Sequence, residues 1–303
     1  MFDPRYEAQL RLLLRCLPLL HDHLEFAVKG GTAINLFVQP LPRLSVDIDL
    51  VYVPLKPRSE ALADITRGLS ALKREMKETL PNAAVQEQHA GGQLARLLLA
   101  GPEASTKVEV NLIFRGAIYP PERAVLCDEA QRYFQAYAHI RRLHVADLYG
   151  GKLCAALDRQ HPRDLYDVKL LLENMGIRPD IRRAFVVYLA GHNRPMSELL
   201  EPHIKDIEAL YKAEFVGMCR RDVPLRELRE VQRELPLLLR KSLDEDERAF
   251  LLSLKRGEPE WDRLGIGHLA DLPALQWKLR NIRLMEENKH QAALRKLEGI
   301  LLS

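Results

Sequence analysis

Two acidic residues on alternate positions of an apolar segment limit what this chain can fold into more than any other feature. The segment is residues 43–52, RLSVDIDLVY, and the acids are Asp47 and Asp49. Successive side chains of a strand point to opposite faces, so both carboxylates point to the same side. Two unpaired carboxylates are very costly in an apolar interior, which excludes an ordinary core on that side. A positive group must therefore lie between them.

A pair of glycines stands shortly before this strand. Residues 28–37, VKGGTAINLF, place Gly30, Gly31 and Thr32 between a short strand and the start of an apolar helix. A helix N-terminus offers free N–H groups and the positive end of a dipole, and glycines allow a phosphate to approach the backbone. The Thr32 hydroxyl can bond a phosphate oxygen or cap the helix. The segment is thus either a phosphate-binding turn or a simple turn.

Together, the acids and the turn predict a magnesium site. Mg²⁺ prefers oxygen ligands, typically one or two carboxylates with substrate phosphates. Glu109 is a lone acid in the apolar segment 108–114, VEVNLIF, and is a third candidate ligand. It could equally face water at a sheet edge or pair with Lys107. Three acids beside a phosphate turn would support phosphoryl transfer with two metal ions.

The periodicity of apolar residues changes near residue 144. Before it, helices are predicted at 5–24, 32–38 and 57–80, the last capped by Ser59, and strands at 26–28, 45–53, 83–89, 94–100 and 106–114. After it, the patterns are helical: 146–159, 163–175, 180–190, 196–218, 224–240, 244–256 and 271–298, with Pro224, Pro236, Pro259 and Pro273 at boundaries. We therefore expect an α+β protein. A mixed sheet of about four or five strands lies within residues 1–144, and a helical domain, 145–303, closes the active-site cleft.

Composition agrees with a folded protein and narrows its setting. The chain has 303 residues, 47% hydrophobic and 29% charged, which is enough to bury a core. With 45 basic and 42 acidic residues, nucleic-acid binding would depend on a local patch. No apolar run is long enough to span a bilayer, and the N-terminus does not read as a signal peptide. The scattered cysteines Cys16, Cys127, Cys154 and Cys219 are typical of reduced thiols, so we expect a cytoplasmic protein without a membrane partner.

Several motifs resemble a known family when taken together. They are Gly30-Gly31-Thr32, then Arg43-x-Ser45-x-Asp47-Ile48-Asp49, then the segments 148–157, LYGGKLCAAL, and 163–167, RDLYD. This combination resembles the nucleotidyltransferase superfamily. More narrowly, it resembles the AbiEii/AbiGii-type toxins of type IV toxin–antitoxin and abortive-infection systems. Similar segments continue into the C-terminal half, to about Ile282. One departure is Gly-Gly-Thr where the wider superfamily often has Gly-Ser.

The resemblance implies a nucleoside triphosphate (NTP) substrate, Mg²⁺ as cofactor, with one or two ions, and a set of site residues. The implied catalytic residues are Asp47, Asp49, Lys152 and Asp164. The implied nucleotide-binding residues are Gly30, Gly31, Thr32, Arg43, Ser45 and Lys152, and the implied metal ligands are Asp47, Asp49 and Glu109. Arg43 would contact phosphate or hold its loop by pairing with a carboxylate.

Lys152 and the acids that follow it have competing interpretations. Lys152 would reach the triphosphate, or it is a solvated lysine on a helix surface. The neighbouring Gly150 and Gly151 cost helix stability and predict close approach of another chain segment or a ligand. Asp164 and Asp167 are three residues apart on one helix face. Asp164 would act as a base or hold Lys152, whereas Asp167 could simply complement the helix dipole.

The implied activity is transfer of a nucleotide from an NTP to an acceptor hydroxyl, with release of pyrophosphate. The resemblance implies the 3′ end of tRNA as acceptor and an antitoxin protein as partner. Arginines and lysines of the helical half would grip RNA by charge: Arg141, Arg142, Arg159, Arg163, Arg182, Arg183, Arg220, Arg221, Lys278, Arg280 and Arg283. The alternatives are a protein hydroxyl, a small antibiotic acceptor, or a non-enzymatic interaction protein with this fold.

Overall fold

The computed structural model describes residues 2–302, which divide into two compact units. The sheet unit runs to Leu148 and also contains Val216–Asp222. The helical unit consists of Tyr149–Phe215 and the chain from Val223 onward. The α+β class is confirmed, because one mixed sheet lies in the first half and the second half is helical. The predicted domain limits, 1–144 and 145–303, stay a prediction.

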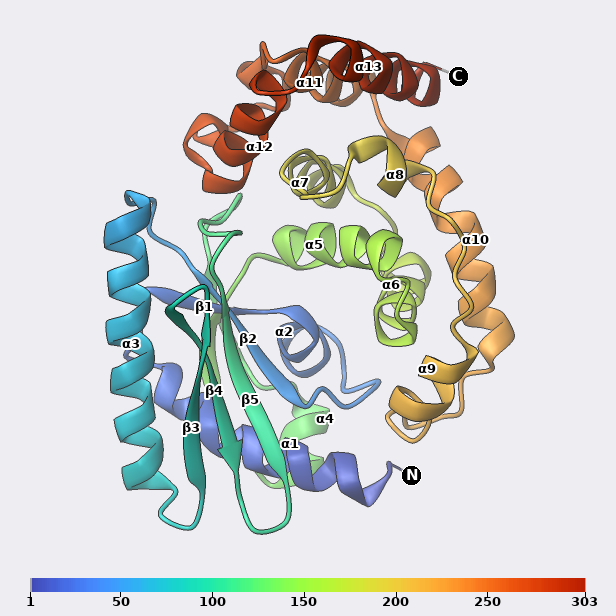
Figure 1. The fold of residues 1–303 in the computed structure, drawn as a ribbon. Helices are drawn as coiled ribbons and strands as arrows, with labels where there is room; N and C mark the ends of the chain where they lie inside the picture. Colours follow the sequence, from blue (N-terminus) through green and yellow to red (C-terminus); the bar gives the residue numbers. More distant parts are fainter. Residues whose placement is uncertain (1, 303) are drawn as a thin grey trace. The chain divides into compact units, whose positions relative to one another are not determined.

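A seven-stranded mixed sheet forms the centre of the sheet unit, in the order β3-β4-β5-β2-β1-β7-β6 (Figure 1). Its strands are β1 Phe26–Lys29, β2 Asp47–Tyr52, β3 Ala84–Ala90, β4 Gln93–Ala100, β5 Ser105–Asn111, β6 Glu122–Val125 and β7 His139–Arg142. β2 is parallel to β5 and β1 is parallel to β7, while the other pairs are antiparallel. The predicted four or five strands are therefore too few, because the short strands β6 and β7 were not expected.

Helices cover both faces of this sheet. They are α1 Pro4–Cys16, the 3₁₀ turn η1 Leu17–Leu20, α2 Gly30–Phe37, α3 Arg58–Thr79 and α4 Asp128–Phe134. Alternate residues of β2 face opposite ways: the Tyr52 hydroxyl donates to Asp64 of α3 at 2.5 Å, whereas Asp49 lies against Gly30 of α2. α3 and α2 accordingly lie on opposite sides of the sheet (Figure 1). Two predicted details are wrong, because α2 begins at Gly30 rather than Thr32 and Ser59 does not cap α3.

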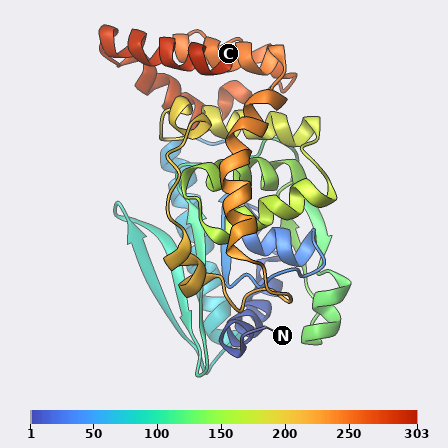
Figure 2. The same ribbon diagram turned by 90° about the vertical axis from the view of Figure 1, so that its right-hand side faces the viewer.

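The helical unit is built from the helices that follow β7. They are α5 Val145–Asp158, which carries the chain out of the sheet unit, α6 Pro162–Asn174, α7 Pro179–Ala190, α8 Met196–Leu200, α9 Glu208–Glu214, α10 Leu225–Ser242, α11 Glu245–Arg256, α12 Pro273–Arg283 and α13 Glu287–Leu301. Helices α11, α12 and α13 gather at the C-terminal end of α10 (Figure 2). The predicted helices 196–218 and 271–298 are each two helices, and Pro236 lies inside α10 instead of at a boundary. Among the described helices, none combines the length and apolar character needed to cross a membrane.

Residues Val216–Asp222, the return segment, bring the chain back to the sheet unit after α9. The amide of Leu44 donates to the Met218 carbonyl at 2.8 Å, and Arg43 forms an isolated β-bridge with Cys219. At the other side, the amide of Asp3 donates to the Gly217 carbonyl at 2.9 Å. The return segment therefore joins the N-terminus to the loop that leads into β2. All four cysteines are free, as predicted.

Candidate active site

Asp49 lies directly against the start of α2. β1 and β2 pair so that Lys29, the residue before α2, is opposite Asp49. Gly30 has φ of +71°, and a Cβ built on it would lie 2.4 Å from the Asp49 Oδ2. Only a residue without a side chain fits between this carboxylate and the helix backbone. The acid and the glycine turn, which were separate features of the sequence, thus lie in contact in the fold.

Gly30→Ala should damage this site more than its backbone geometry alone would. We expect a loss of about 1–2 kcal/mol from the left-handed conformation, together with displacement of the Asp49 carboxylate and a large loss of activity. Gly91→Ala is the matched control, because Gly91 has φ of +58° but open space around its missing Cβ. Urea unfolding measures the first effect, and the rate of the activity proposed below measures the second. Equal activity in both variants would show that the contact with Asp49 is unimportant.

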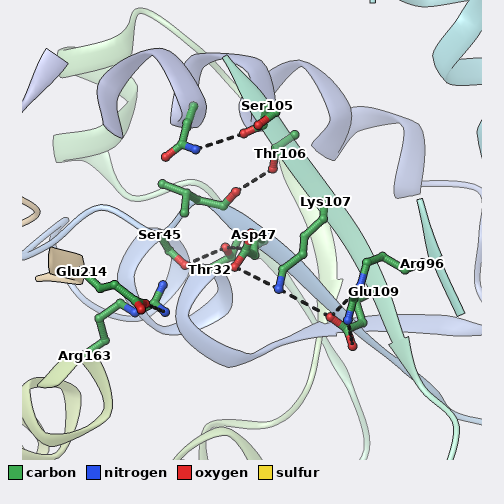
Figure 3. A network of polar contacts seen from close by, with 12 residues as sticks. Thr32, Ser45, Asp47, Arg96, Ser105, Thr106, Lys107, Glu109, Arg163 and Glu214 are labelled. Carbon is green, nitrogen blue, oxygen red and sulfur yellow. Dashed lines mark hydrogen bonds and ion pairs between the residues drawn. The ribbon is translucent and has the colours of Figure 1, made fainter. Parts of the chain in front are cut away.

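Lys107 is a positive group beside Asp47, but its two ion pairs join Asp47 to Glu109 and not Asp47 to Asp49. β2 and β5 are parallel and in register, so Asp47 is opposite Lys107 and Asp49 is opposite Glu109. The Lys107 Nζ lies 3.5 Å from Asp47 Oδ2 and 3.6 Å from Glu109 Oε2 (Figure 3). Arg96 from β4 donates two hydrogen bonds to Glu109, at 2.8 and 3.1 Å. Burial would raise the pKa of Glu109, but Arg96 and Lys107 outweigh it and the pKa is lowered.

The acids offer a divalent cation a pair of ligands. Asp47 and Asp49 present carboxylates on one partly exposed face, which matches the one or two protein carboxylates that Mg²⁺ takes beside substrate phosphates. Within residues 2–302, no three His, Cys, Asp or Glu side chains are grouped closely enough to hold a metal ion. Glu109 shares the face but is engaged by Arg96 and Lys107. Its role as a third ligand stays a prediction.

Thr32, Ser45 and Arg43 form a buried layer beneath this face. The Thr32 hydroxyl lies 2.5 Å from the Asp47 carbonyl, to which it donates, and 3.1 Å from the Ser45 hydroxyl (Figure 3). Arg43 is 2% exposed and donates to the Leu44 carbonyl at 2.9 Å. A Cβ on Gly31 would lie 2.8 Å from both the Arg43 guanidinium and the Ser45 hydroxyl. These contacts tie α2 to β2, and the Thr32 hydroxyl does not cap the helix.

A buried ionic cluster occupies the helical unit. The Lys152 Nζ lies 2.8 Å from Asp164 Oδ1 and 3.0 Å from Asp167 Oδ2, and Arg159 approaches the other Asp164 oxygen at 2.8 Å. The Lys152, Asp164 and Asp167 side chains are 7%, 5% and 0% exposed. A solvated Lys152 and a surface Asp167 that merely complements the helix dipole are therefore both wrong.

The electrostatics of this cluster bear on the role of Asp164. Burial alone would raise the pKa of Asp164, but the charges of Lys152 and Arg159 outweigh it and hold the pKa well below its usual range. A carboxylate with such a low pKa takes up a proton poorly near neutral pH. Of the two interpretations left open by the sequence, the contacts favour holding Lys152 over acting as a base.

The glycines beside Lys152 allow two helices to approach each other. A Cβ on Gly150 would lie 2.7 Å from backbone and side-chain atoms of Ala184 in α7. A Cβ on Gly151 would meet only the Tyr188 ring, at 3.6 Å. The predicted close approach of another chain segment is thus confirmed at Gly150.

Alanine at each glycine gives a matched pair of variants. Gly150→Ala should destabilise the protein by about 1–3 kcal/mol, because overpacking exceeds the gain in helix propensity. Gly151→Ala should be neutral or stabilising by up to about 1 kcal/mol. Thermal and urea unfolding of the two proteins, followed by circular dichroism, measure this. Equal stabilities would contradict the tight helix crossing.

Most arginines and lysines expected to grip RNA have structural partners. Arg142 pairs with Glu122, Arg163 with Glu214 and Arg182 with Glu247. Lys278 donates to the carbonyls of His192 and Arg194 at 2.6 and 2.8 Å, and burial lowers its pKa to about 8. Arg183, Arg221 and Arg280 remain exposed.

The sequence indicated Lys107 as a partner of Glu109, but it did not indicate the second ion pair of Lys107, with Asp47, or Asp167 as a partner of Lys152. The spacing of Lys107 and Glu109 places both on one strand face, and that was the available signal for Lys107. For Asp167, the signal was its position three residues after Asp164 on the same helix.

Comparison with known proteins gave two findings. The family model described as "Nucleotidyl transferase AbiEii toxin, Type IV TA system" matches residues 11–281. Among solved structures, the chain is similar to MenT4, a nucleotidyltransferase toxin from Mycobacterium tuberculosis H37Rv, with a TM-score of 0.61. That match covers 91% of this chain and 93% of the other at 17% sequence identity, so it supports the fold alone. No curated protein sequence matches.

Proposed function

Because the chain belongs to the AbiEii nucleotidyl transferase toxin family of type IV toxin–antitoxin systems, we propose that it transfers a nucleotide from an NTP to the 3′ hydroxyl of tRNA. In this reaction the acceptor oxygen forms a bond to the α-phosphorus and loses its proton. The bond from that phosphorus to the bridging oxygen breaks, and pyrophosphate leaves with the electron pair. Asp47, Asp49 and Glu109 are the proposed metal ligands.

The single observation that carries the proposal is the contact of Asp49 with Gly30. It joins a carboxylate pair, Asp47 and Asp49, to the N-terminus of an eight-residue helix whose first residues have no Cβ. The amides at that end favour phosphate oxygens, and the carboxylates favour a cation that accompanies phosphate. An acid pair beside such a turn suits an NTP better than an uncharged ligand.

Each remaining side chain has a proposed part. Asp47 and Asp49 would hold Mg²⁺, which when bound offsets phosphate charge and polarises the phosphoryl oxygens. Thr32, Ser45 and Arg43 keep α2 and β2 together, and Gly30 and Gly31 let Asp49, Arg43 and Ser45 pack against the start of α2. The amides of this turn would bind phosphate. Lys152 would contact phosphate as a point charge, with Asp164 and Asp167 as its positioning residues.

Labelled triphosphates test the activity directly. The purified protein is incubated with each α-labelled NTP, Mg²⁺ and total tRNA, with the Asp49→Asn variant in parallel. We expect label on RNA, blocked when the RNA 3′ end has been oxidised, and pyrophosphate released in equal amount. Label on protein would reassign the acceptor. Absence of transfer and of NTP binding in the correctly folded protein would contradict the proposal.

The proposal includes an antitoxin protein partner and a cytoplasmic location, where NTPs and tRNA are found. Expression of the chain should arrest growth, and co-expression of its antitoxin partner should restore it. Arrest by the Asp49→Asn variant would show that toxicity does not depend on transfer.

A further inference from the structure

Arg115 is a buried guanidinium without a counter-charge. It follows β5 and is 6% exposed, and its Nε and Nη1 are buried without hydrogen-bond partners. Among residues 2–302, no carboxylate forms an ion pair with it. Burial lowers its pKa, and the nearby charge of Arg58 adds to this, but an arginine stays charged in proteins. Buried charges are normally paired, so this position favours an anion supplied from outside the chain.

The topology places Arg115 beside the start of α3. β2 and β5 are parallel, with Val51 opposite Asn111, so the loops that follow them leave the same end of the sheet (Figure 1). The amide of Gly116 donates to the Tyr52 carbonyl at 2.8 Å, which ties the Arg115 loop to the end of β2. α3 begins six residues after Tyr52, at Arg58.

The first turn of α3 adds further donors. α3 has 22 residues, and its N-cap, Pro57, makes no side-chain hydrogen bond to the free amides. Arg58 and Ser59 are exposed in this turn, and within the described residues Arg58 has no ion-pair partner. Free amides at a long helix N-terminus, a hydroxyl and two guanidinium groups are the donors that bind a phosphate.

The acids nearest to this place have other partners or face solvent. Asp64 is already engaged by the Tyr52 hydroxyl, Lys56 and Arg67, and Glu25 faces His23. Glu60 is exposed in the first turn of α3 and would weaken, but not cancel, the attraction for an anion.

We propose that Arg115, Arg58, Ser59 and the first-turn amides of α3 bind a phosphate group, on the face of the sheet opposite Asp47 and Asp49. The faces differ because Tyr52, which points toward α3, is an odd number of residues from Asp49. The bound phosphate is separate from the NTP site of the proposed function. It comes either from an RNA backbone or from a free nucleotide.

Phosphate binding is measured by isothermal titration and thermal shift, with inorganic phosphate as probe, in EDTA. The Asp47→Asn/Asp49→Asn protein serves as the background, so that failure of the proposed function leaves this test intact. We expect phosphate to raise Tm in this background and in the Arg74→Met control, whose exposed arginine lies further along α3. Arg58→Met should weaken binding about tenfold, and Arg115→Met should abolish the Tm shift.

The Arg115→Met variant removes an unpaired buried charge, so without phosphate it should fold at least as well as its parent. Competition then identifies the source of the phosphate. Displacement of phosphate by tRNA assigns an RNA backbone. In that case, the slope of the logarithm of tRNA affinity against the logarithm of salt concentration should fall by about one unit in Arg58→Met. Displacement by a mononucleotide alone assigns a nucleotide. Equal phosphate-induced shifts in Arg115→Met and Arg74→Met, or no shift in any protein, would overturn the proposal.

Discussion

Asp49→Asn should lower the rate of nucleotide transfer on the order of 10³-fold while leaving the fold intact. Asparagine keeps the shape that fits over Gly30 but removes the charge, so the acid pair that would hold a cation is reduced to Asp47. Charge stabilisation by a bound metal is worth several kcal/mol, and each 1.4 kcal/mol corresponds to about tenfold in rate. Initial rates at saturating NTP and Mg²⁺ give the effect, and circular dichroism verifies the fold.

Asp22→Asn is the matched control for this variant. It removes the same charge from the same unit, but the Asp22 side chain is 94% exposed and lies outside the proposed site. We expect its rate to equal that of the parent protein. If Asp49→Asn retained a rate within tenfold of the parent, the acid pair could not be the metal site.

The second large effect concerns stability. Lys152→Met removes the cation that faces two buried carboxylates, Asp164 and Asp167. Breaking a buried ion pair from one side costs about 3–5 kcal/mol, because the remaining charge is left without compensation. Arg159 still faces Asp164, so we expect Asp167 to cause most of the loss. Urea unfolding, with the slope of the transition verified, measures the change.

Lys152→Met/Asp167→Asn distinguishes charge from shape. Removing the uncompensated carboxylate as well should restore at least half of the lost stability, whereas activity should stay absent. If Lys152→Met alone lost less than about 1 kcal/mol, the cluster would not be buried in solution.

Acidification offers an independent measure of the same cluster. The pKa of Asp164 is lower in the folded protein than its ordinary value of 3.8, so its ionised form stabilises the fold above that pH. This contribution should disappear as the pH falls below 3.8 and toward the folded pKa. The Lys152→Met variant should lose less stability over this pH range than the parent protein does, because Arg159 is then the only remaining cation of the cluster beside Asp164.

Local patterns predicted the elements whose burial is periodic. The alternating segment 45–53 contains β2, and the long apolar stripe at 57–80 contains α3. β6 and β7 lacked such a signal because each has four residues, ERAV and HIRR, with few apolar side chains. They are strands because they pair with each other and β7 pairs with β1, which local periodicity does not show.

The errors among the helices have separate causes. Pro202 follows α8 closely and disfavours helix in the residue before it, so 196–218 should have been divided. The sequence pattern predicts a boundary at Pro236, yet α10 continues through it because Leu228, Leu235 and Leu239 are buried along one side. Burial of these leucines outweighs the loss of the backbone hydrogen bond that a proline inside a helix cannot donate.

Within the candidate site, residues close in sequence were the predictable part. The glycine turn and the acid pair lie within 20 residues of each other, and their proximity followed from a strand–helix–strand order. The position of Lys107 depends on β2 pairing with β5, in a register that joins residues 60 positions apart. The unpaired Arg115 could not be anticipated, because an arginine in a loop normally reaches solvent.

The return segment has a consequence for the order in which the protein matures on the ribosome. The loop before β2 is completed by the hydrogen bond from Leu44 to the Met218 carbonyl and by the bridge to Cys219. Between Leu148 and Asp222 the ribosome must add 74 residues, which takes roughly 4–15 s at about 5–20 residues per second. During that interval the nascent chain contains β2, but the loop before β2 still lacks its backbone partners in the return segment. A polypeptide released early would therefore carry Asp47, Asp49 and Glu109 and still lack the backbone contacts that complete the loop before β2.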